Sequence, residues 1–194
     1  MPKQKVTEEE ILKQSLRLFR QKSYHNTSVA DIAEACGLLK GSLYHYFPSK
    51  EALMSAVIAY AHNIFKVKVF AIAYDAQLSP QERMEKMFQQ SERILLSEGN
   101  IMGNIGVETA RVIPDFANLI RDFYTDWMNA VAFIFEAVTD KKSALLLAEQ
   151  TVAEFEGAVM MSRIYKDAKF IHNAYERLMN RFAAVSLSKS NKQI

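Results

Sequence analysis

A run of hydrogen-bonding groups in the first quarter of the chain is the part of this sequence best suited to do chemistry. The run consists of Lys40, Gly41, Ser42, Tyr44, His45 and Tyr46, and it contains no carboxylate. Donor side chains without carboxylates suit a negatively charged groove such as the major groove of a DNA duplex. Lys50 follows at a predicted helix start, within reach of a phosphate.

Two short helices are predicted to present this run. Ser28 and Asp31 form a capping box that begins the first helix, and Gly37 ends it because glycine tolerates a left-handed turn. The second helix covers about residues 40–46 and ends before Pro48. Their small shared core consists of Ile32, Ala33, Leu38, Leu43 and Phe47. Two short helices on such a core form a helix-turn-helix.

Most of the remaining sequence is also predicted to be helical. Thr7 and Glu10 form a capping box for the first helix, and Ser79-Pro80-Gln81-Glu82 is a clear helix start. A long helix begins at Lys50 and keeps an apolar face to about Tyr74. Later helices are expected at about residues 80–97, 114–139, 143–166 and 170–187, with Asp140-Lys141-Lys142 as a turn. The segment from Gly99 is expected to begin as a loop and to become a short helix that ends at Arg111.

The sequence therefore predicts an all-α protein of about nine helices. An N-terminal three-helix, helix-turn-helix DNA-binding domain over residues 5–65 contains the helix-turn-helix at about 28–47. The long helix joins it to a C-terminal helical bundle over residues 66–188. Residues 189–194 are expected to form a frayed tail.

Composition and charge agree with a helical protein that binds DNA near its N-terminus. Hydrophobic residues make up 49% of the chain and there are only six glycines and four prolines, which favours a helical core over disorder. Residues 1–66 carry nine Lys and Arg against six Asp and Glu, whereas the rest carries fifteen against sixteen. The basic excess thus lies where a footprint on phosphates is expected.

A cytoplasmic location without a membrane segment is expected. Cys36 is the one cysteine, so no intrachain disulfide can form, which favours a reducing compartment. The first ten residues turn acidic where a secretory signal would be apolar, and no apolar run reaches the roughly 18 residues that span a bilayer. Cys36 is interpreted as a small buried residue, with a redox switch as the alternative.

Enzyme motifs are missing from the sequence. There is no Glu-x-x-His pair for a di-iron site, no HExxH zinc motif, no GxSxG elbow and no glycine-rich nucleotide loop. We therefore expect no catalytic residue, no metal and no cofactor. A helical interaction adaptor is a further alternative, although it would not need the exposed surface from Lys40 to Tyr46.

The segment from Val6 to Phe65 resembles the DNA-binding domain of the tetracycline-repressor (TetR/AcrR) family. The matching residues are Ile32-Ala33, Ala35-Cys36-Gly37 and the stretch from Lys40 to Leu53. The resemblance implies a dimeric, ligand-responsive repressor whose third helices enter the major grooves of a pseudo-palindromic operator. It also implies DNA-facing positions at Ser28, Lys40, Gly41, Ser42, Tyr44, His45, Tyr46 and Lys50.

Leu39 departs from the family pattern, which usually has Ser at this helix cap. Leucine has no side-chain oxygen to accept from the helix, at a cost of about 0.5–2 kcal/mol relative to Ser. Either the helix begins differently, or Leu39 contacts a thymine methyl group.

The C-terminal bundle is expected to hold a small-molecule inducer. Its methionines and phenylalanines can line an adaptable, mostly apolar cavity. The resemblance implies an inducer, and a mostly apolar one suits a lining of Phe65, Phe88, Phe123, Tyr124, Trp127, Met128 and Phe155.

The last two long helices are expected to form the dimer interface. Each carries an apolar stripe: Leu145, Ala148, Val152, Phe155 and Val159 on one, and Ile171, Ala174, Leu178, Phe182 and Val185 on the other. We expect these stripes to pair with their symmetry mates in a four-helix bundle. The alternative is that both stripes face the core of their own monomer.

Overall fold

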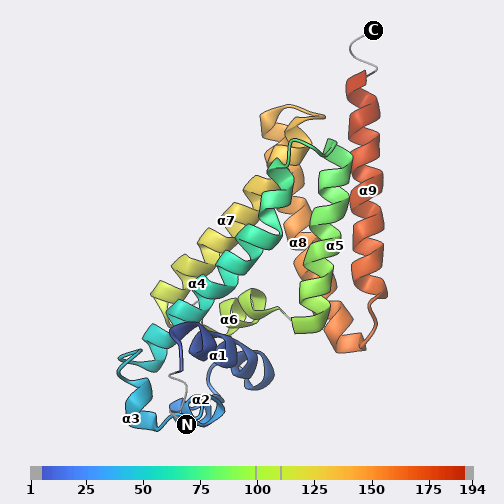
Figure 1. Ribbon diagram of the computed structural model, residues 1–194. Coiled ribbons are helices and arrows are strands. Elements are labelled where there is room, and N and C mark those ends of the chain that lie inside the picture. Colours follow the sequence, from blue (N-terminus) through green and yellow to red (C-terminus); the bar gives the residue numbers. More distant parts are fainter. Residues whose placement is uncertain (1–5, 99, 110, 191–194) are drawn as a thin grey trace. The chain divides into compact units, whose positions relative to one another are not determined.

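The computed structural model describes residues 6–98, 100–109 and 111–190, and over these residues it confirms the all-α prediction. Nine α-helices, one 3₁₀-helix and no β-strand occur in those ranges (Figure 1). They are α1 (Glu8–Lys22), α2 (Val29–Ala35), α3 (Lys40–Leu43), α4 (Lys50–Lys68), η1 (Phe70–Tyr74), α5 (Pro80–Glu98), α6 (Ile101–Thr109), α7 (Pro114–Glu136), α8 (Lys141–Tyr165) and α9 (Lys169–Ser190).

The chain forms two compact units, which we call the headpiece and the body. The headpiece comprises residues 1–63 and 98–121, and the body comprises residues 64–97 and 122–194. A single boundary after residue 65 is expected from the sequence, whereas α6 and the start of α7 group with the N-terminal helices. Of the predicted tail, residues 189 and 190 end α9, and residues 191–194 lie outside the described residues.

Side-chain caps and a small apolar core build the headpiece. The predicted capping boxes are present: Thr7 with Glu10 begins α1, and Ser28 with Asp31 begins α2. Gly37 has a φ of +65°, which supplies the predicted left-handed turn after α2. Ile32, Ala33, Leu43 and Phe47 are buried as predicted, whereas Leu38 is half-buried.

Long helices build the body. α8 and α9 are antiparallel neighbours joined by a turn in which Lys166 adopts a left-handed conformation. Glu154 on α8 accepts hydrogen bonds from both Arg177 and Arg181 on α9. Burial opposes ionisation of Glu154, but the two arginines outweigh it and hold its pKa below the ordinary value.

Several helix boundaries differ from the sequence expectation. α4 ends at Lys68 rather than near Tyr74, and the 3₁₀ turn that follows places the Phe65 and Phe70 rings 6.0 Å apart. α8 begins at Lys141, inside the expected turn, because the Asp140 side chain accepts from the Ser143 N–H and caps the helix.

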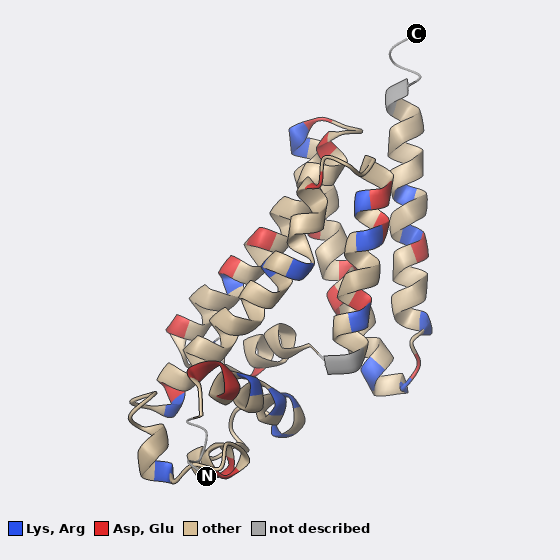
Figure 2. Cartoon of the chain, in the orientation of Figure 1, with Lys and Arg blue, Asp and Glu red and all other residues tan. Residues whose placement is uncertain are grey.

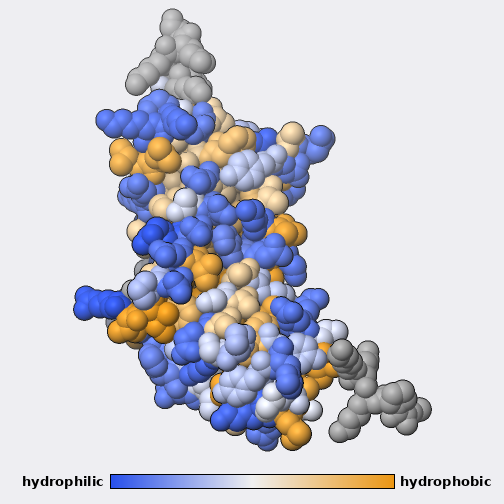
Figure 3. All heavy atoms as spheres, turned by 90° about the vertical axis from the view of Figure 1, so that its left-hand side faces the viewer, coloured by the Kyte–Doolittle hydropathy of each residue, from blue (hydrophilic) through white to orange (hydrophobic). Residues whose placement is uncertain are grey.

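The segment from Lys50 to Tyr74 is long and apolar enough to cross a membrane by length and composition alone. Its apolar side is nevertheless buried within the protein, at residues that include Leu53, Val57, Ala61 and Phe65. The face of the molecule in Figure 3 shows separate hydrophobic patches interspersed with hydrophilic residues, not one continuous apolar belt. We therefore interpret the segment as a core helix.

Candidate DNA-binding surface and ligand site

The α3 helix holds its polar run on a short, well-anchored turn. Its α-helical span ends at Leu43, earlier than expected, and three-residue turns continue the chain: the His45 N–H donates to Ser42 O and the Tyr46 N–H to Leu43 O. Leu43 and Phe47 are buried and anchor this turn. Figure 2 shows basic but no acidic colour on α3.

The structure leaves most of the predicted DNA-facing residues accessible. Ser28, Lys40, Gly41 and His45 are exposed, Tyr44 is 43% exposed, and Ser42, Tyr46 and Lys50 are half-buried. The Tyr46 hydroxyl donates to the Val6 carbonyl at 2.9 Å, so this tyrosine fixes the segment before α1. Gly41 has open space around the position of a side chain.

Leu39 occupies the N-cap of α3 without capping it. Its backbone has the extended geometry of a cap, but its side chain makes no cap hydrogen bond and is 80% exposed. The helix therefore begins where the family pattern places it, which removes the explanation that it begins elsewhere. Contact with a thymine methyl group remains as a hypothesis for this leucine.

Tyr24 is a buried centre of the headpiece that the sequence analysis missed. Its hydroxyl donates to Glu51 at 3.2 Å, and the Lys50 ammonium lies 4.3 Å from its ring centroid. Burial, followed by the charge of Glu51, raises the pKa of Tyr24, and burial lowers the pKa of Lys50. No local pattern marks Tyr24, because it lies in a segment that only breaks the helical periodicity.

The start of α2 carries a charge-assisted cap. The Asp31 carboxylate accepts from the Ser28 N–H at 2.8 Å and pairs with Lys22 at 2.7 Å. The hydrogen bond from Lys22, with those from Ser28, holds the pKa of Asp31 well below its usual range. This network fixes α2, against which α3 packs.

Cys36 is half-buried at the end of α2. Burial, and then the charge of Glu10, raise the pKa of its thiol. A raised pKa leaves less thiolate, the reactive form. The arrangement favours the interpretation of Cys36 as a small packing residue over a redox switch.

The structure brings six of the seven residues predicted to line a ligand site into one aromatic cluster in the body. Ring centroids lie 5.3 Å apart for Phe65 and Phe123, 5.8 Å for Trp127 and Phe155, and 4.9 Å for Phe88 and Phe155. Tyr124 stacks on Trp127 at 6.3 Å. Met128 follows on α7 and is half-buried, while Phe70 joins the cluster without having been predicted.

The rings pack closely against one another. The crevice lined by Phe88, Phe155, Leu178 and their neighbours is too narrow for a water molecule. Trp127 is 2% exposed, and its Nε1–H has no hydrogen-bond acceptor among the described residues. A buried donor without a partner costs about 1–3 kcal/mol, so the indole N–H is a position where an acceptor would be favoured.

The neighbouring Tyr124 is also perturbed. Burial, the charge of Glu156 and a hydrogen bond to it raise the pKa of Tyr124.

The apolar stripes expected at the dimer interface are instead buried within the monomer. All but Leu145 and Val185 are buried in the single chain, including Val152, Phe155 and Phe182. The α8 and α9 faces bury these residues against each other and against the aromatic cluster, so the alternative interpretation is the right one for these stripes.

Other faces of α8 and α9 remain uncovered. On α8, residues separated by alternating steps of four and three point outward: Leu146, Gln150, Ala153, Gly157, Met160 and Ile164, of which Gly157 is half-buried and the others are exposed. A side chain added at Gly157 would meet nothing within 4 Å. On α9, Ala183, Ala184 and Leu187 are exposed.

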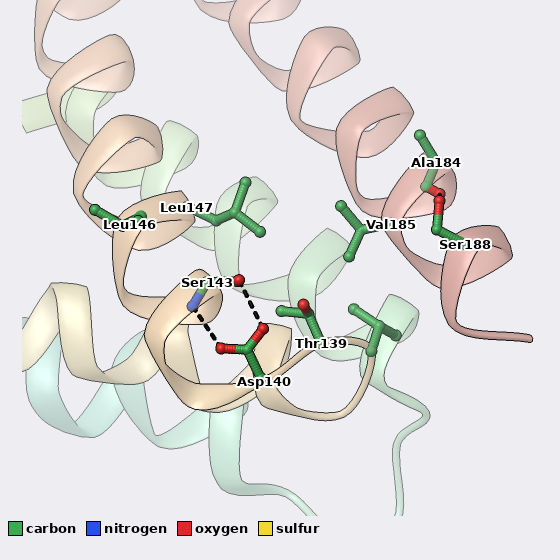
Figure 4. A pocket seen from close by; sticks show the side chains of 9 residues that line it. Thr139, Asp140, Ser143, Leu146, Leu147, Ala184, Val185 and Ser188 are labelled. Carbon is green, nitrogen blue, oxygen red and sulfur yellow. Dashed lines mark hydrogen bonds between the residues drawn. The ribbon is translucent and has the colours of Figure 1, made fainter. Parts of the chain in front are cut away.

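A groove of about 810 Å³ lies between the start of α8 and the end of α9. Figure 4 shows Leu147 and Val185 pointing toward each other across it, with Asp140 and its hydrogen bonds to Ser143 below. Ser188 also lines the groove. No group of three or more His, Cys, Asp or Glu that could hold a metal ion occurs among the residues that the structure describes.

Two family models match this chain, one in its N-terminal part and one in its C-terminal part. The family model described as "Bacterial regulatory proteins, tetR family" matches residues 11–57, and the one described as "Transcriptional regulator LmrA/YxaF-like, C-terminal domain" matches residues 73–177.

Similar proteins span different shares of the chain. The HTH-type transcriptional regulator YuxN of Bacillus subtilis is 46% identical over 59 residues, which are 30% of this chain but only 20% of YuxN. The HTH-type transcriptional repressor DhaR of Mycobacterium sp. strain GP1 is 22% identical over 87% of this chain and 90% of its own length. A TetR transcriptional regulator from Legionella pneumophila superposes with a TM-score of 0.84 at 25% identity, covering 93% of this chain and 99% of that one.

Proposed function

We propose, from the premise that this chain belongs to the TetR family of bacterial transcriptional regulators, that it is a ligand-responsive repressor. In this proposal a cytoplasmic homodimer binds a pseudo-palindromic operator and is released by a small, mostly apolar inducer. The observation that carries the DNA-binding part is the exposed, carboxylate-free surface of α3 and the turn after it, anchored by buried Leu43 and Phe47.

The DNA-binding proposal assigns different roles to the exposed residues. We propose that Lys40, with His45 and Tyr44, reaches base edges, and that Ser28 contacts a phosphate at the start of α2. Lys50 stays in the proposal as a phosphate contact. Because its ammonium also lies over the Tyr24 ring, substitution of Lys50 would disturb the headpiece as well as DNA binding.

Lys40→Ala is therefore the cleaner test of DNA binding. A duplex is first selected from a random library by the wild-type protein, and affinities are then measured by fluorescence anisotropy at two salt concentrations. Loss of a base contact should weaken binding by about 1–3 kcal/mol, and loss of a phosphate contact should flatten the salt slope by about one unit. Lys86→Ala, an exposed lysine on α5, is the matched control. A wild-type protein without salt-dependent duplex binding would overturn the proposal.

The uncovered faces of α8 and α9 support the dimer. The outward residues of α8 follow the steps of four and three that pack helices side by side, and Gly157 allows a close approach. The adjoining groove beside Leu147 and Val185 extends this apolar surface. A second copy, related by a two-fold axis, would cover the same surface on both chains.

Introduction of a charge on the outer face of α8 tests the dimer. Light scattering of the wild-type protein should give twice the chain mass of 22.1 kDa. Ile164→Glu should shift the protein toward the monomer, because both copies would bury a carboxylate at the interface. Val67→Glu places the same charge at an exposed valine of α4 and should leave the mass unchanged. A wild-type monomer at micromolar concentration would contradict the proposal.

The aromatic cluster is the proposed inducer site. Its closely packed rings require that an inducer displaces side chains on entry, which gives ligand binding a structural consequence. α4 contributes residues to both units, so movement of its C-terminal end in the body reaches the headpiece through one continuous helix. The inducer must bind the DNA-incompetent state better, and a preference of about 1–3 kcal/mol lowers DNA affinity roughly 5–150-fold.

Trp127→Phe tests the inducer site. A panel of lipophilic aromatic compounds, with and without hydrogen-bond acceptors, is screened for quenching of Trp127, the only tryptophan, and for release of the selected duplex. Phenylalanine keeps an aromatic ring but removes the N–H, so an acceptor-bearing inducer should release DNA at roughly 10-fold higher concentration. Unchanged release by every active compound would show that the site lies elsewhere.

A further inference from the structure

Glu108, near the end of α6, holds the turn that follows α1. Its Oε1 accepts from the His25 N–H at 2.8 Å and its Oε2 from the Tyr24 N–H at 3.1 Å. Both amides lie past the end of α1, so they do not donate within that helix, and the carboxylate accepts from them instead. All of these residues belong to the headpiece.

The turn held by Glu108 is also tied to two other helices of the headpiece. The Tyr24 ring packs edge-on against Phe116 of α7, with centroids 5.4 Å apart, and its hydroxyl donates to Glu51 of α4. The Glu108 side chain is 19% exposed, so water screens its two hydrogen bonds only in part. Charge-assisted bonds of this kind are short and directional, and a small displacement of α6 would break them.

We propose that Glu108 is a positioning residue that latches α6 to the helix-turn-helix, so that α6 and the DNA-binding surface change state together. The inference rests on the proposed DNA-binding function. In sequence, α6 lies between α5 and α7, which carry Phe88 and Trp127 of the aromatic cluster. In this proposal a rearrangement of the cluster shifts α6, and Glu108 passes the shift to the turn that precedes α2.

Linkage makes the latch testable without knowing the inducer. If α6 and the helix-turn-helix are coupled, DNA bound at α3 must alter α6 as well. The experiment measures residue-resolved amide hydrogen exchange of the full chain, with and without a duplex selected from a random library. The variants are Glu108→Ala, Glu108→Gln, which keeps one acceptor oxygen without the charge, and Glu34→Ala, which removes an exposed carboxylate from α2.

In the wild-type protein and in Glu34→Ala, DNA should change exchange of the α6 amides at least threefold. In Glu108→Ala this response should vanish while the response of α2 and α3 persists, and the Tyr24 and His25 amides should exchange roughly 10- to 100-fold faster. Glu108→Gln should be intermediate, and it serves alone if Glu108→Ala does not fold.

Two results would overturn the latch. One is an α6 response to DNA that survives the loss of Glu108, and the other is unchanged exchange of the Tyr24 and His25 amides. A wild-type protein that binds no duplex would overturn the proposed function, and the latch with it, whereas wild-type binding with a surviving α6 response overturns the latch alone.

Discussion

In the headpiece α2 and α3 are short helices of seven and four residues, whereas the body packs helices of 19 to 25 residues through aromatic rings. Side-chain caps hold the segments next to the short helices of the headpiece. Short helices bury little apolar surface, so the headpiece depends on directional contacts at Ser28, Tyr24 and Glu108. The body depends on non-directional ring packing around Trp127. The difference fits the proposed function, in which a fixed geometry would serve base reading and a core of packed rings would rearrange on ligand entry.

Truncation of a ring in the body should give the largest effect. Phe155→Ala removes a buried ring that contacts both Phe88 and Trp127, and it should lower the free energy of unfolding by about 3–5 kcal/mol. Urea denaturation measures the change. Tyr165→Ala, at an exposed position at the end of α8, is the control and should change it by only about 0.5 kcal/mol. A small effect of Phe155→Ala would mean that the cluster is loosely packed.

A missing cap in the headpiece can be restored. Leu39→Ser adds a side-chain acceptor where the backbone already has cap geometry, and it should raise headpiece stability by about 0.5–2 kcal/mol. Leu39→Ala, which cannot cap, is the matched control. If Leu39 contacts a thymine methyl group, both substitutions should weaken binding to the selected duplex alike. Equal stability of the Ser and Ala variants would contradict the capping argument.

The charged contact between α8 and α9 should be sensitive to acid. The pKa of Glu154 is lower in the folded chain than its ordinary value of 4.5, so its stabilisation is present above that pH. It is lost as the pH falls through the lowered folded value. Glu154→Gln should therefore cost about 1 kcal/mol or less at pH 7 and nothing in strong acid. Thermal denaturation of both proteins across this range tests the sign, and a pH-independent difference would refute it.

The smallest expected effect concerns the rate at which the Cys36 thiol reacts. Because burial raises its pKa, the thiol should react with a disulfide reagent at pH 7 more slowly in the folded protein than in urea. Glu10→Gln retains the capping-box geometry of α1 but removes the nearby charge, so it should speed the reaction slightly. Faster reaction in the folded state would revive the redox interpretation.

The sequence by itself determined the local features of this protein. Capping boxes at Thr7 and Ser28, the left-handed turn at Gly37 and the family to which the chain belongs all follow from residues close together in sequence. Such signals are reliable because a cap or a tight turn is decided by a few neighbouring residues and their backbone angles. The aromatic residues that gather in the body were also identified from their sequence positions, although Phe70 was not.

Only the tertiary structure decided which surfaces are covered and which distant groups meet. Helical periodicity identified the stripe through Val152 and Phe155 as apolar, but it could not tell whether the same chain or a second copy buries it. Nor could it place Glu108 on the backbone of Tyr24 and His25, more than 80 residues away in sequence. A helix has several faces and a carboxylate can accept from many donors, so these choices depend on how the helices pack, which local sequence does not encode.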